Sequence, residues 1–178
     1  MRFLAAVLFF CALGLAQQPE TPQPFEVKGI KLGSSLAQSK EKGLTCLSLP
    51  SDKTPSDEYV CLVPNATYAG LSVSEMAMFY KDRLASIYFK FGQDKFETLK
   101  DALQQKFGKP ASTEVKTYQN AYGAKFTGEY IVWSNGVSTI TLEEMGGSRD
   151  QSVLLFSHTE IAGEQLKAKK AKAKPDDM

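Results

Sequence analysis

Residues 84–110 read LASIYFKFGQDKFETLKDALQQKFGKP. In the first part of this stretch, apolar side chains recur at every second position: Ala85, Ile87, Phe89 and Phe91. This alternation predicts a strand over 84–91 with one buried face. In the second part they recur at steps of three and four: Phe96, Leu99, Leu103 and Phe107. This spacing predicts a helix over 95–107, opened by Asp94 and Glu97 and ended by Gly108. Together they predict an α+β domain.

Further elements flank this stretch on both sides. Upstream, Ser35 and Gln38 form a capping-box pattern that predicts a short helix ending at Gly43. Runs rich in β-branched and aromatic residues predict strands at 25–30, 58–63, 71–80, 130–133, 137–142 and 153–158. We expect a tight turn at 81–83, a polar connector between the second helix and residue 130, and another turn at Gly146 and Gly147.

Asn135 and Gly136 separate two of these runs. The Asn-Gly pair is typical of a two-residue hairpin turn in which both residues adopt positive φ. The sequence therefore predicts a hairpin here, and we interpret the neighbouring Trp133 as a core residue.

The order of elements repeats. Each half of the chain has a capped helix, a connector, a strand beginning with Glu-Tyr and then a hairpin. The matching segments are 58–60 with 129–131, 73–74 with 137–138, and 87–89 with 154–156. We therefore expect a duplicated α-β-β-β unit, forming an antiparallel sheet with two helices on one face. Chance agreement between short strand patterns is the alternative.

This succession resembles the β-lactamase inhibitory protein fold, which small outer-membrane assembly lipoproteins share. The likeness covers most of residues 25–160. It includes the helix boundaries Ile30-Lys31-Leu32-Gly33 and Phe107-Gly108-Lys109-Pro110. Glycine and proline commonly flank helices in any fold, so these boundaries are not specific to this family. The resemblance implies a two-repeat α+β fold, and it does not choose a function, because this fold carries several.

The first sixteen residues are typical of a cleavable signal peptide. Arg2 precedes an apolar run over 3–13, and Ala16 is a small residue before the cut. A membrane anchor would need roughly 20 apolar residues, and a lipoprotein at Cys11 is disfavoured by the bulky Phe10. We expect an exported protein, periplasmic or extracellular. It would have an extended leader without a packing role over 17–24, a single domain over 25–162 and a Lys-rich flexible tail over 163–178, which is either a frayed helix or disordered.

Without the signal peptide, the chain retains Cys46 and Cys61. An even cysteine count in an oxidising compartment predicts a disulfide, which would constrain the polar segment between them. A thiol redox pair is the alternative, although such pairs are normally two residues apart.

The charges are balanced overall and concentrated at the C-terminus. Lysines occupy positions 167, 169, 170, 172 and 174. The rest of the mature chain is slightly acidic, which argues against nucleic-acid binding by the fold itself. No later segment is apolar enough to span a membrane. A solvated tail is the simple interpretation, and weak contact with anionic envelope polymers or lipid headgroups is the alternative.

The sequence offers little for catalysis. His158 is the only histidine, so every triad or histidine-metal scheme would depend on it. The adjacent carboxylates Glu143 and Glu144 would point to opposite faces of a strand. We expect neither a cofactor nor a metal, and we interpret His158 as an ordinary strand or surface residue.

Binding has one candidate location. Aromatic rings fall at every fourth position: Tyr118, Tyr122, Phe126 and Tyr130. In an extended chain this even spacing would put all four rings on one face, where they would either cover the sheet core or form a binding surface. The leading hypothesis is a small exported binding module for a protein or envelope polymer. An extracytoplasmic enzyme or redox protein using Cys46 and Cys61 is the alternative.

Overall fold

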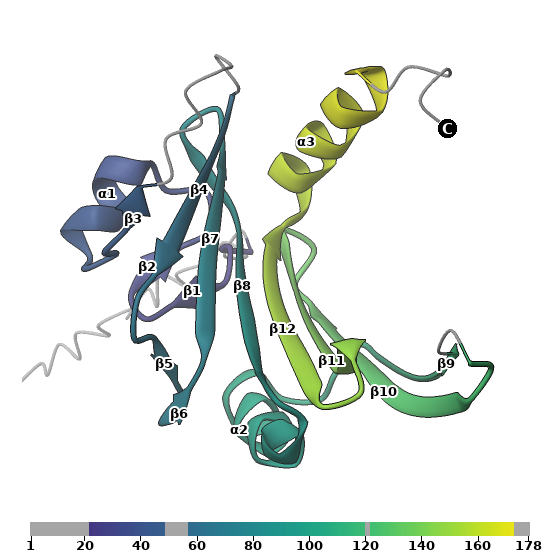
Figure 1. The fold of residues 1–178 in the computed structure, drawn as a ribbon. Coiled ribbons are helices and arrows are strands. Elements are labelled where there is room, and N and C mark those ends of the chain that lie inside the picture. The colour runs from purple at the N-terminus through teal and green to yellow at the C-terminus, as the bar shows by residue number, and fades with distance from the viewer. Residues whose placement is uncertain (1–21, 49–56, 120–121, 173–178) are drawn as a thin grey trace, which may run out of the picture.

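The computed structural model describes residues 22–48, 57–119 and 122–172. Its centre is an eight-stranded antiparallel sheet in the order β3-β4-β7-β8-β12-β11-β10-β9 (Figure 1). The strands are β3 (Leu47–Ser48), β4 (Glu58–Val63), β7 (Ser74–Tyr80), β8 (Arg83–Gly92), β9 (Ser112–Gln119), β10 (Lys125–Ser134), β11 (Ser138–Ser148) and β12 (Gln151–His158). The α+β class and the antiparallel sheet are therefore confirmed, with strands dominating the described residues.

The remaining elements are short hairpins and helices. The hairpins are β1 (Glu26–Val27) with β2 (Ile30–Lys31), and β5 (Thr67–Tyr68) with β6 (Leu71–Ser72). The helices are α1 (Leu36–Glu41), the 3₁₀ turn η1 (Gln93–Lys95), α2 (Phe96–Phe107) and α3 (Thr159–Lys172). The Ser35 and Gln38 capping box is present at α1, whereas α2 begins without a side-chain cap because η1 precedes it.

The main core lies between α2 and one face of the sheet, here called the inner face. The predicted helix residues Phe96, Leu99 and Leu103 are buried there against strand residues such as Phe89 and Phe156. Trp133 belongs to the same cluster, and its indole N–H donates to the Gly108 carbonyl at 2.8 Å. The interpretation of Trp133 as a core residue is confirmed. Leu36 of α1 packs against this cluster as well.

A bulge changes the predicted face of one residue in β8. Met78 pairs with Ser86, but Phe79 pairs with Leu84, so Ala85 is an extra residue opposite the junction. Leu84 therefore joins the main core, while Ala85 packs with Ile161 of α3. The prediction that Ala85 shares a face with Ile87 was wrong, because strict alternation cannot anticipate a bulge.

The Asn135-Gly136 hairpin forms with a different turn. Ser134 pairs with Thr139, and only Gly136 of the two central residues has positive φ, at 83°. The Asn135 Oδ1 instead accepts from the Val137 and Ser138 backbone N–H groups. The hairpin was predicted correctly and the two-residue turn was not, because the Asn135 side chain stabilises a wider loop.

The expected connector before residue 130 is in fact a pair of strands. Residues 112–119 form β9 and pair with β10, which begins at Lys125. Gly146 and Gly147 likewise lie within β11, in an irregular stretch between Glu143 and Ser148, and the chain turns only after them. These segments are polar, so the sequence pattern did not distinguish a solvated strand from a loop.

The two ends of the domain also differ from expectation. Residues 163–172 continue helix α3, so the predicted boundary of the flexible tail falls inside a helix. At the other end, the Gln23 carbonyl accepts from the Asn135 side chain, so the leader has a packing contact. The predicted signal peptide, residues 1–16, lies outside the described residues.

The strand order is symmetric about its centre. Strands β4, β7 and β8 on one side mirror β10, β11 and β12 on the other, and the halves meet where Tyr88 pairs with Leu155. These two residues were matched by the sequence repeat. The sequence repeat also matches Tyr59 with Tyr130, but these two residues are not equivalent in the structure. Tyr59 packs against the main core, whereas Tyr130 lies on the opposite face of the sheet.

Candidate binding face

An apolar band crosses the face of the sheet that points away from α2, here called the outer face. Cross-strand pairing places one residue from each of six consecutive strands in a row, which we call the outer band: Leu62, Met76, Tyr88, Leu155, Thr141 and Val132. All six side chains are half-buried, and none belongs to either of the two buried clusters.

Helix α3 covers one end of the outer face. Ile161 is 1% exposed and packs with Tyr80 and Ala85. Glu164 accepts from the Arg83 guanidinium at 2.7 Å, which holds the helix beside β8. Figure 1 shows α3 leaving the end of β12 that is far from α2. The outer band lies beyond this small cluster.

Three of the four predicted aromatic residues lie on the outer face. Tyr118 of β9 pairs with Phe126 of β10, and Tyr130 follows four residues later on the same side. Tyr122 is 97% exposed in the connection between the two strands. The chain reverses direction at this point, so the four rings do not share one extended strand as predicted.

Polar contacts hold this aromatic group in place. The Tyr118 hydroxyl donates to Glu143 Oε1 at 2.6 Å, and the Lys116 ammonium lies 3.0 Å from the centre of the Tyr130 ring. Burial and the acceptor Glu143 together raise the pKa of Tyr118 well above its usual range. Burial, followed by the charge of Glu143, also raises the pKa of Tyr88. Glu143 therefore interacts both with Tyr118 of this aromatic group and with Tyr88 of the outer band.

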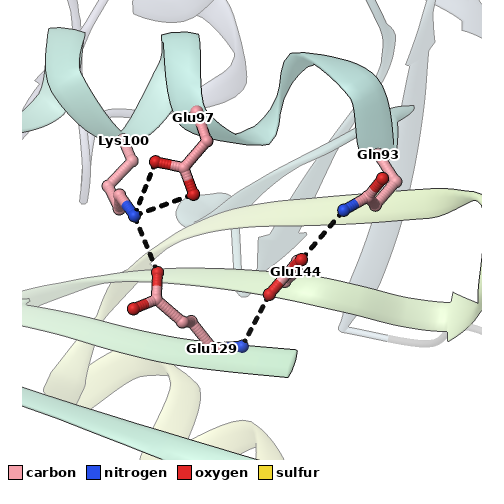
Figure 2. Close-up of polar contacts among 5 residues, drawn as sticks. All are labelled: Gln93, Glu97, Lys100, Glu129 and Glu144. Atoms are coloured by element: carbon pink, nitrogen blue, oxygen red, sulfur yellow. Dashed lines mark hydrogen bonds and ion pairs between the residues drawn. The ribbon is translucent and has the colours of Figure 1, made fainter. Parts of the chain in front are cut away.

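The inner face carries a polar network near the start of α2 (Figure 2). Lys100 donates to Glu97 at 2.9 Å and to Glu129 at 2.8 Å. Glu144 accepts from the Gln93 side chain and from the Glu129 backbone N–H. Every carboxylate in this network accepts a hydrogen bond from a donor in the protein. We therefore interpret the network as a set of contacts, called the clamp below, that fixes α2 to β10 and β11.

The predicted separation of the two glutamates is confirmed. Glu143 accepts a hydrogen bond from the Tyr118 hydroxyl on the outer face, whereas Glu144 lies on the inner face in the clamp. They cannot flank one bond. Among residues 22–48, 57–119 and 122–172, no group of three or more potential metal ligands is found.

Cys46 and Cys61 form the predicted disulfide, with their Cα atoms 4.9 Å apart. Cys61 of β4 pairs with Ala77 of β7 and is completely buried in the main core. Cys46 is half-buried and packs against the same cluster, so burial shields the Cys61 side of the bond from attack by a second thiol.

His158 ends β12 beside the Gly33 turn. Burial lowers its pKa, with the Arg83 charge acting in the same direction and Glu160 opposing it. Its Nδ1 is buried without a hydrogen-bond partner among the described residues. Burial thus favours the neutral form of the imidazole, which packs at the end of β12.

One buried charge was not anticipated. Glu75 is 4% exposed on the inner face of β7, and Lys28 in the β1–β2 turn binds it at 2.5 Å. Lys28 also borders a cavity of about 260 Å³ that includes Tyr68 and Lys106. Because its ammonium is already paired, Lys28 mainly fixes the small hairpin over the core.

None of the described helices is long and apolar enough to cross a bilayer. The fold and its outer face define a small disulfide-containing α+β domain with an open sheet surface. A family model described as "Uncharacterised protein" matches residues 27–177, and the chain belongs to this family. No curated protein and no solved structure matches the chain.

Proposed function

We propose that this chain is a small exported binding module that holds another protein against the outer face of its sheet. The observation that carries this proposal is the outer band, a row of five large apolar or aromatic side chains and Thr141 that belongs to neither buried cluster. A contiguous apolar surface on a soluble protein usually takes part in an interaction.

The dimensions and composition suit a protein partner. Neighbouring strands lie about 4.8 Å apart, so a row of six residues extends about 24 Å across the sheet. One side of an ordinary interface covers roughly 800 Å², which is about 28 Å across, so the outer band would form one row through such an interface. Tyr88 and Met76 are residue types enriched at interfaces, and the aromatic group around Tyr130 extends the apolar area at one end.

The export part of the proposal rests on the signal peptide predicted at 1–16. The Cys46–Cys61 disulfide supports it, because such bonds persist in oxidising compartments. The burial of Cys61 favours a structural bond over a redox function. Thiol titration of the native protein distinguishes them: no reactive thiol supports the structural bond, whereas a readily reduced pair would support the redox alternative.

We also infer that the two halves of the sheet arose by duplication. The mirrored strand order and the pairing of Tyr88 with Leu155 support this inference. The outer band would then be built from equivalent strands of both halves.

A secondary contact with anionic envelope polymers or headgroups is favoured by α3, where Lys167, Lys169 and Lys170 are exposed. Removal of residues 163–178 should then abolish salt-sensitive binding to anionic vesicles. Unchanged binding by the truncated chain would contradict this contact.

The outer-face proposal is tested by comparing three baits in envelope extract from the source cell. The baits are the wild-type chain, the double variant Tyr88→Ser/Leu155→Ser and the control Leu166→Ser, which alters an exposed leucine on α3. We expect a protein that wild type and control retain and that the double variant binds at least tenfold more weakly when purified. A partner that binds all three equally would contradict the proposal, as would capture of a polysaccharide instead. Circular dichroism checks that each bait is folded.

A further inference from the structure

The two edges of the sheet are very different. At one edge the described part of β3 has two residues, while at the other β9 runs for eight residues from Ser112 to Gln119. An edge strand presents unpaired backbone N–H and C=O groups along its outer side, which makes it a template for another strand.

Strand β9 lacks the proline, glycine and bulge that often block such pairing. Its sequence, STEVKTYQ, contains neither proline nor glycine, and its pairing with β10 is regular throughout. Val115 is 70% exposed, a rare state for a valine in a strand. Figure 1 shows the β9–β10 end of the sheet reaching away from α2, so the helix leaves this edge accessible.

The sequence of β9 is complementary to itself. When two copies run antiparallel about an axis at Val115, each Glu114 faces Lys116 of the other copy. In the same register Thr113 faces Thr117, and the two exposed Val115 side chains face each other. Directly opposite residues have Cβ atoms about 4.5–5.5 Å apart, close enough for these charges to pair.

We propose that β9 pairs with β9 of a second copy of this chain, in the antiparallel register centred on Val115. The sheets of the two copies then continue into one another and both bare edges become satisfied. The Lys116 ammonium stays on the same face as the Tyr130 ring and gains a carboxylate beside it. This dimer does not depend on the proposed function of the outer band.

Charge reversal tests the register by sedimentation of the purified full chain. Wild type should dimerise with increasing concentration. Glu114→Lys and Lys116→Glu each place like charges opposite one another at two symmetric positions, and each should weaken dimerisation about tenfold. The double variant should recover the wild-type affinity, and a mixture of the two single variants should form a heterodimer. A monomeric wild type, or dimers indifferent to these changes, would overturn the proposal.

Disulfide crosslinking tests the position of the axis independently of the charges. Val115→Cys should oxidise to a covalent dimer, because the two Cβ atoms meet at the axis. Thr117→Cys lies on the same strand and face but opposite Thr113, so it should remain uncrosslinked. Equal crosslinking from both positions, or none from Val115→Cys, would contradict this register.

Discussion

At the level of single residues, Gly146 has the least space for a side chain among the glycines that the structure describes. A Cβ at this position would lie 2.1 Å from Val153 Cγ2. We predict that Gly146→Ala lowers the free energy of unfolding by about 1–3 kcal/mol, because β11 and β12 would have to separate locally. Urea denaturation monitored by circular dichroism measures this change.

The matched control is Gly163→Ala in helix α3, where a Cβ would meet no atom within 4 Å. Alanine favours helix by about 1 kcal/mol over glycine, so this variant should be as stable as wild type or slightly more stable. Equal loss of stability in both variants would show that the close approach at Gly146 is not the cause.

His158 should make stability depend on pH. Its folded pKa is lowered by burial, so protonation favours the unfolded chain. The stabilisation is present above the unfolded pKa of about 6.5 and is lost as the pH falls from there towards the folded pKa. We predict that the stability difference between wild type and His158→Gln shrinks between pH 7.5 and 5.5. A difference that stays constant in parallel urea titrations would contradict the pKa direction.

Single residues also show where sequence reasoning reaches its limit. The apolar spacing of Phe96, Leu99 and Leu103 identified core residues correctly, because a helix imposes its period locally. The faces of Ala85 and Tyr130 were not predictable, since one depends on a bulge in β8 and the other on the reversal between β9 and β10.

At the level of elements, the disulfide connects β4 to the segment that precedes it. It closes a loop of fifteen residues, and removing it frees the unfolded chain. We predict that Cys46→Ser/Cys61→Ser loses about 3 kcal/mol of unfolding free energy. Denaturation of this variant should match that of the reduced wild type, and a loss well below 1 kcal/mol would show that the bond contributes little.

Elements with strong local patterns were predicted, and polar ones were missed. Strand 58–63 was placed with its observed bounds, and α2 was placed to within one residue. Strand β9 was missed because its residues alternate between solvent and a weakly covered face. The extent of α3 was left open between a frayed helix and a disordered tail, because Ile161 is the only fully buried apolar residue among its described side chains. Both elements depend on neighbours that are distant in sequence.

At the level of the whole molecule, the outer band could not be predicted at all. Its six residues come from six strands, and each is unremarkable within its own segment. Only the pairing register brings Leu62, Tyr88 and Val132 into one row. Three of the four predicted aromatic residues also lie on the outer face. The binding location predicted from the sequence is therefore one part of a larger surface.

Site-specific photocrosslinking in the source cell tests the outer face most directly. A benzophenone amino acid replaces Leu155 in the outer band, and a control replaces Gln105, which is exposed on α2. The outer-face proposal predicts one defined covalent adduct with another protein from position 155 and none from position 105. No adduct from position 155, or the same adducts from both positions, would contradict it.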